Sequence, residues 1–184
     1  VYFFGNGRSD GTRDMKPVLG GKGANLAEMT NLGVPVPPGF IIATGRSIEY
    51  LETGQIADGL REEVATALQE LETASGKRFG DPTNPLLVSV RSGAAVSMPG
   101  MMETILNLGL NDETVEGLAQ ASGNPRFALD SYRRFLQMYA DVVLEVPIAR
   151  FEQVLSSKRM AHGVSTDSEL NADALRTLVA EYNQ

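Results

Sequence analysis

The chain has 184 residues, with 16 Lys and Arg against 23 Asp and Glu, so its formal net charge is -7. This length suits one domain or two small ones, and the acidic balance argues against broad nucleic-acid binding, which requires a basic surface. The lack of cysteine excludes disulfides, thiolate zinc sites and cysteine nucleophiles. No apolar run reaches the ~20 residues of a membrane-spanning helix. We therefore expect a cytoplasmic protein without nucleic-acid or membrane partners.

Residues 1–110 alternate expected strands and helices. Short strands are predicted at the apolar segments Val1–Phe4 and Phe40–Ile42, the second after a proline-rich stretch that cannot be helical. Apolar residues at helical spacing predict two helices, and these residues are Leu26, Met29 and Leu32 before a stop at Gly33, then Leu60, Val64, Leu68 and Leu71. Residues 86–90 predict a buried strand, and the segment ETILNLGL at 103–110 is compatible with another. This alternation indicates an α/β domain.

Residues 111–184 change to a helical pattern. Asn111 or Asp112 can cap a first helix, and the apolar face of a second runs from about 127 to 143. Arg133 and Arg134 lie on the opposite face, where we expect a solvated surface or, alternatively, a docking site for another domain. Two shorter helices are expected near 150–159 and 172–182. Because the chain begins at Val1 and stops inside a helical pattern, we expect a piece of a longer protein, with domains at 1–110 and 111–184.

The segment LGGKGANLAEM surrounds Lys22 with Gly20, Gly21 and Gly23 just as a helix begins. Glycines allow a close backbone approach, and the first N–H groups of a helix point outward without partners, so a lysine here suits a phosphate site. The spacing matches neither the Walker A loop nor G-x-G-x-x-G. A glycine hinge with a solvated lysine is an equally acceptable interpretation.

The segment SVRSGAAVSMPGMMETILNLG places Arg91 at the end of a predicted strand, before a run of small residues. The planar guanidinium of arginine binds phosphate oxygens in pairs and stays charged. The small residues would let backbone N–H groups approach the same anion. Taken alone, the pattern fits a salt-bridged arginine in a tight turn better than it fits a phosphate site.

These two segments, together with NPRFALDSYRRFLQMYADVV, resemble the pyruvate, phosphate dikinases over nearly the whole chain. The resemblance implies the N-terminal lobe of an ATP-grasp nucleotide-binding domain, with a mixed sheet and flanking helices, followed by a small all-helical subdomain. It implies ATP, with Mg²⁺, as the bound cofactor. In this family a histidine on a mobile domain carries phosphate from ATP to pyruvate at a separate barrel domain.

The resemblance also implies the residues that bind the ATP phosphates, which are Lys22, Arg91, Gly100, Met101 and Thr104. The small residues after Arg91 would then bring backbone to the triphosphate. His162 lies in KRMAHGVST, which does not match the family's phosphocarrier motif, so we expect an exposed loop histidine and no catalytic residue in this chain. The family's magnesium ligands fall beyond Gln184. Glu103 and Asp112 are nearby carboxylates that no motif assigns to a metal.

We therefore expect an ATP-binding fragment of a pyruvate, phosphate dikinase that is inactive alone. Its partners would be ATP or AMP and the missing phosphohistidine and pyruvate-binding domains, and we expect a monomer. One alternative is a fragment of a phosphoenolpyruvate synthase-like dikinase, which the Met-Pro-Gly-Met-Met run at 98–102 disfavours. Another is a non-catalytic nucleotide-binding module.

Overall fold

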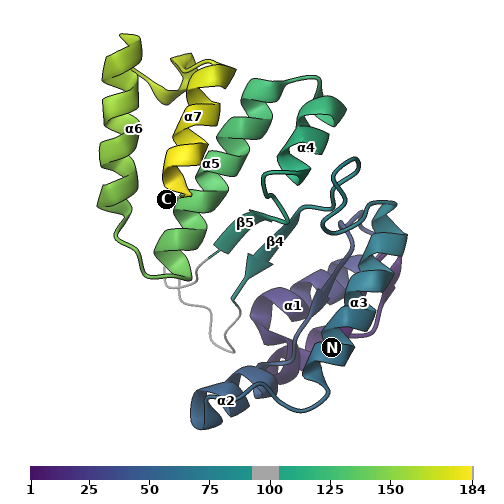
Figure 1. Ribbon diagram of the computed structural model, residues 1–184. Helices are drawn as coiled ribbons and strands as arrows, with labels where there is room; N and C mark the ends of the chain where they lie inside the picture. Colours follow the sequence, from purple (N-terminus) through teal and green to yellow (C-terminus); the bar gives the residue numbers. More distant parts are fainter. Residues whose placement is uncertain (93–103, 184) are drawn as a thin grey trace. The chain divides into compact units, whose positions relative to one another are not determined.

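A computed structural model describes residues 1–92 and 104–183 of the chain (Figure 1). The chain divides into two compact units. The first unit contains Val1–Gly76 and Ser92, and the second contains Lys77–Arg91 and residues 104–183. No helix in the described ranges is both long and apolar enough to cross a membrane.

The first unit is built on a three-stranded sheet in the order β2-β1-β3. The strands are β1 (Tyr2–Gly5), β2 (Arg8–Ser9) and β3 (Gly39–Ile41), and both pairings are antiparallel. Asn6 and Gly7 join β1 to β2 with φ of 51° and 77°. Positive φ at both positions of a two-residue loop gives the turn that matches the twist of a hairpin.

The described residues of the first unit also form four helical segments: η1 (Arg13–Met15), α1 (Lys16–Asn31), α2 (Thr44–Thr53) and α3 (Leu60–Ser75). A small core of Leu19, Ala24 and Ala27 packs against Tyr2 and Ile41. The buried face of α1 therefore consists of small residues. Of the residues that predicted this helix, Met29 and Leu32 lie exposed, because α1 packs on β1, β2 and the Ile41 side chain through its small residues instead.

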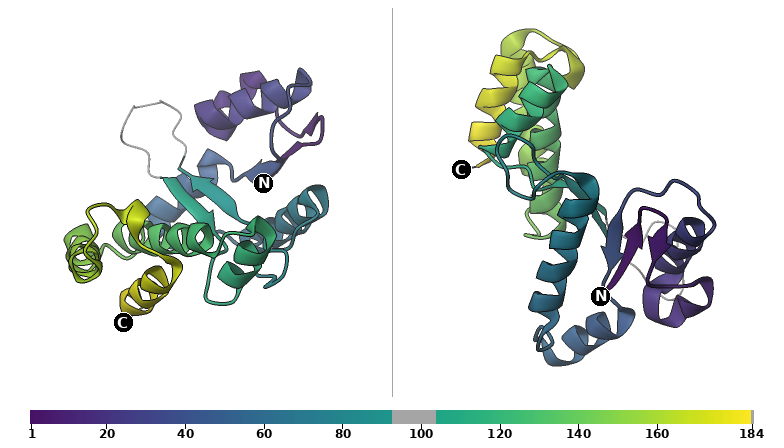
Figure 2. Two further views of the ribbon diagram at one scale, coloured as in Figure 1. Left: turned by 90° about the horizontal axis from the view of Figure 1, so that it is seen from above. Right: turned by 90° about the vertical axis from the view of Figure 1, so that its right-hand side faces the viewer.

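The second unit opens with a two-stranded antiparallel sheet, β4 (Val88–Arg91) and β5 (Thr104–Leu108). Its helical segments are α4 (Thr114–Ser122), α5 (Pro125–Val142), α6 (Ile148–His162), η2 (Asp167–Glu169) and α7 (Ala172–Tyr182). Figures 1 and 2 show α4, α6 and α7 gathered around α5, with which each makes contact. Asn111 stabilises the start of α4, because its Oδ1 accepts hydrogen bonds from the N–H groups of Glu113 and Thr114. The residue directly before α4 is Glu113, however, and its side chain forms no capping hydrogen bond.

The core of the second unit extends from the helices to the sheet. Leu129, Leu155, Leu175 and Leu178 are almost fully buried at its centre. Ile105 and Leu108 of β5 pack against this cluster, as does Leu87, which precedes β4. The β4–β5 hairpin consequently groups with the helices, whereas the sequence suggested a division at residue 110. Each strand pairing within the two sheets is antiparallel, so the described chain is α+β; the expected mixed sheet does not occur within either.

Candidate functional site

Lys22 lies where a new helical segment begins inside α1. Gly20, with φ 68° and ψ 168°, interrupts the helix, and Gly21, Lys22 and Gly23 form the first turn after it. This backbone conformation is accessible almost only to glycine. A Cβ added to Gly23 would lie 3.0 Å from Ile41 Cδ1, whereas Gly21 faces open space. Lys22 is exposed in this first turn, a position where the N–H groups of a helix generally lack intrahelical partners.

Two adjacent glycines allow a direct test of this helix start. We expect Gly20→Ala to lower the free energy of unfolding of the first unit by about 1–3 kcal/mol, because alanine is strained at its φ and ψ. Gly21→Ala is the matched control, and it should stabilise α1 by about 0.5–1 kcal/mol, because its helical position is open. Urea unfolding followed by circular dichroism measures both. Equal shifts in the same direction would refute the assigned role of Gly20.

Arg91 and Thr104 are direct cross-strand partners at the end of the β4–β5 hairpin. Side chains opposite each other in an antiparallel pair lie on the same face of the sheet. Ile105 packs against the helical core, so Thr104 and Arg91 occupy the other face, and Arg91 is exposed. Within the described part of the chain Arg91 forms no ion pair, so the salt-bridged alternative finds no support there.

The structure brings together two of the five residues that the sequence singled out. Arg91 and Thr104 belong to the second unit, and Lys22 belongs to the first. Gly100 and Met101 lie outside the described residues, as does Glu103.

Residues 1–92 and 104–183 contain no group of three His, Asp or Glu side chains that could hold a metal ion. Asp112 instead accepts a hydrogen bond from the Tyr132 hydroxyl at 3.1 Å. Burial raises the pKa of the Tyr132 phenol, and the Asp112 carboxylate raises it further. His162 is exposed, as expected, although it ends α6 rather than lying in a loop.

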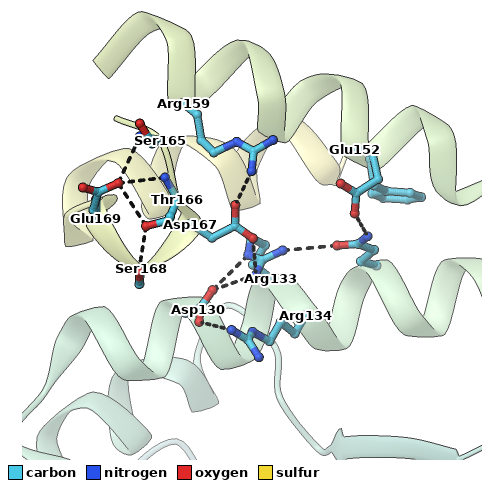
Figure 3. Close-up of polar contacts among 12 residues, drawn as sticks. Asp130, Arg133, Arg134, Glu152, Arg159, Ser165, Thr166, Asp167, Ser168 and Glu169 are labelled. Atoms are coloured by element: carbon cyan, nitrogen blue, oxygen red, sulfur yellow. Dashed lines mark hydrogen bonds and ion pairs between the residues drawn. The ribbon is translucent and has the colours of Figure 1, made fainter. Parts of the chain in front are cut away.

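Arg133 contradicts the expectation of a solvated face, because its side chain is buried. Its guanidinium donates to Asp130 Oδ1 at 2.9 and 3.0 Å and to Gln137 Oε1 at 3.2 Å, and it lies 3.7 Å from Asp167 Oδ2 (Figure 3). Arg134 remains exposed and contacts Asp130 Oδ2 at 3.1 Å. The segment around η2 brings Asp167 over this face of α5, so the two arginines have different environments.

Nearly the whole chain is similar to proteins of known function. Residues 16–77 and 48–176 match the family model described as "Pyruvate phosphate dikinase, AMP/ATP-binding domain". The chain is 53% identical over 183 residues to pyruvate, phosphate dikinase of Clostridium symbiosum, covering 99% of this chain and 20% of that protein. It is 54% identical over 187 residues to the enzyme of Giardia intestinalis, covering 100% of this chain and 21% of that protein. The chloroplastic pyruvate, phosphate dikinase 1 of Oryza sativa subsp. japonica is 53% identical over 99% of this chain and 19% of its own length.

Proposed function

Because this chain belongs to the family of the pyruvate phosphate dikinase AMP/ATP-binding domain, we propose that it binds the phosphates of ATP within a longer pyruvate, phosphate dikinase. The observation that carries the proposal is the identity of more than half of its residues over 99% of its length to such enzymes. The chain spans about a fifth of the length of these relatives.

We assign the phosphate contacts to Lys22, Arg91 and Thr104, with Gly100 and Met101 contributing backbone. The ammonium group of Lys22 and the guanidinium of Arg91 would neutralise charge on the triphosphate, and arginine can contact two phosphate oxygens at once. Thr104 supplies a hydroxyl beside Arg91. The N–H groups that follow Gly20 lie at the positive end of a helix dipole, which would attract the phosphate anions. An ATP-grasp-type lobe is the fold that we propose to present these groups.

ATP would reach such a site as its magnesium complex, since phosphate oxygens bind Mg²⁺ readily. The described residues of this chain do not form a magnesium site by themselves. We therefore assign no metal ligand among these residues. The contribution of this chain is to bind and orient the phosphates and to neutralise their charge, which is most of what a protein does in phosphoryl transfer.

In the longer protein, phosphate from ATP would pass to a histidine and then to pyruvate, giving AMP, pyrophosphate and phosphoenolpyruvate from ATP, phosphate and pyruvate. His162 is exposed at the end of α6 and outside any phosphocarrier motif, so the carrier would belong to another part of that protein. The relatives are pyruvate, phosphate dikinases, which does not favour a phosphoenolpyruvate synthase.

An acceptor assay tests this function. The longer protein that contains this chain is incubated with ATP, pyruvate and Mg²⁺, with or without phosphate. We expect AMP and phosphoenolpyruvate only when phosphate is present, together with pyrophosphate. Product formation without phosphate would instead identify a synthase that uses water. The 184-residue chain alone should form no phosphoenolpyruvate, and turnover by it would contradict the proposed division of roles.

A further inference from the structure

In the β4–β5 hairpin, β5 contains one residue more than β4 between the Val88–Leu108 pair and the Val90–Ile105 pair. Val88 pairs with Leu108, whereas Val90 pairs with Ile105 and Arg91 with Thr104. Leu106 and Asn107 of β5 therefore lie opposite the single residue Ser89. Two residues facing one on the partner strand define a β-bulge.

The bulge decides which residue lies opposite Arg91. If the pairing of Val88 with Leu108 continued without the extra residue, Ile105 rather than Thr104 would face Arg91. A shift of one residue moves every side chain of a strand to the opposite face. Ile105 would then leave the helical core that it contacts together with Leu108. The extra residue lets β5 keep both leucine and isoleucine in the core and still place Thr104 beside Arg91.

Asn107 supplies the backbone conformation of the bulge. Its φ is 59°, and it is one of only a few non-glycine residues with positive φ in the described chain. Asparagine adopts this left-handed region more readily than other non-glycine residues, and β-branched residues are strongly disfavoured there. Asn107 makes no side-chain hydrogen bond among the described residues, whereas its carbonyl oxygen accepts from Leu110 N at 3.2 Å. The requirement at this position therefore concerns the backbone.

We infer that Asn107 is a positioning residue for phosphate binding: its left-handed backbone maintains the bulge that places Thr104 opposite Arg91. This inference rests on the proposed function of that pair. Asn107 contacts no substrate in this account and acts only through the register of β5. Substitution of Asn107 by a residue that readily adopts positive φ should preserve the strand register, whereas substitution by a residue that does not should disrupt it.

The test compares Asn107→Gly with Asn107→Val in the complete 184-residue chain. Glycine should preserve the nuclear Overhauser contacts between the backbones of Arg91 and Thr104, and it should keep the MgATP dissociation constant within about twofold of the original chain. Valine should abolish the contacts between Arg91 and Thr104 and weaken MgATP binding by about tenfold or more, while the resonances of the helical core stay dispersed. If valine unfolds the second unit, Asn107→Ala is assessed by the same contacts.

The two readouts separate this inference from the proposed function. Retention of the Arg91–Thr104 contacts in the valine or alanine variant would overturn the role of Asn107, whatever the nucleotide affinity. Loss of the contacts with equal MgATP affinity in all variants would confirm the bulge but overturn its link to phosphate binding. The inference is supported if Asn107→Val loses both the contacts and the MgATP affinity while Asn107→Gly keeps both. A purely structural role of Asn107 would not make the MgATP affinity change together with the strand register.

Discussion

Replacing Arg133 with alanine is expected to lower the free energy of unfolding of the second unit by about 3 kcal/mol. The Arg133 side chain is only 4% exposed and contacts Asp130 and Asp167. Removing one member of a buried charge pair leaves the other charge without compensation. The expected loss lies at the lower end for such pairs, because Asp130 keeps Arg134 at 3.1 Å and Asp167 keeps Arg159 at 3.1 Å.

Arg134→Ala is the matched control for this prediction. It removes the same charge from the neighbouring residue, which contacts the same Asp130, but its side chain is 66% exposed. Exposed ion pairs contribute about 0–1 kcal/mol, so the variant should unfold nearly like the original chain. Urea unfolding followed by far-ultraviolet circular dichroism measures the loss of the second unit's helices. Similar small losses in both variants would show that the Arg133 network contributes no more than a surface pair.

The environment of Arg133 illustrates what the sequence could not predict. The pattern of α5 identified the buried positions Tyr132 and Phe135, although Phe127 and Val143 at the ends of the predicted face are exposed. It assigned Arg133 to the opposite, solvated side. In the structure Asp167 and Glu152, from distant parts of the sequence, contact this polar side. Helical periodicity reports which residues share a face, but it does not report whether a second element covers the polar one.

The candidate site was predictable in its parts and not in its arrangement. The glycine run predicted a helix start at Lys22, where the structure has an interruption at Gly20 inside a helix that already begins at Lys16. The apolar segments predicted both strands of the β4–β5 hairpin. The residue pattern pointed to Arg91, whereas Thr104 came only from the family resemblance. Their pairing depends on a one-residue bulge at Asn107, whose positive φ carries only a weak sequence signal because asparagine occurs in many other conformations.

Replacing Arg91 with alanine is expected to weaken MgATP binding more than replacing Lys22 does. Arg91→Ala should raise the MgATP dissociation constant by about tenfold to a hundredfold, because hydrogen bonds to charged groups contribute about 1.5–3 kcal/mol each. AMP, with fewer phosphates, should lose less. Arg150→Ala is the control, since Arg150 is an exposed arginine of α6 in the same unit and its removal changes the net charge equally. Equal losses for Arg91→Ala and Arg150→Ala would indicate only a general charge effect.

Calorimetric titration with MgATP asks whether Lys22 and Arg91 bind the ATP phosphates, and it compares the original 184-residue chain with Lys22→Ala and Arg91→Ala. Lys16→Ala provides the control for Lys22, because both are exposed lysines of α1. We expect binding by the original chain and by Lys16→Ala, with affinity weakened about tenfold or more in Lys22→Ala and Arg91→Ala. MgATP binding of unchanged strength in Lys22→Ala and Arg91→Ala would contradict the assignment of these residues to the ATP phosphates.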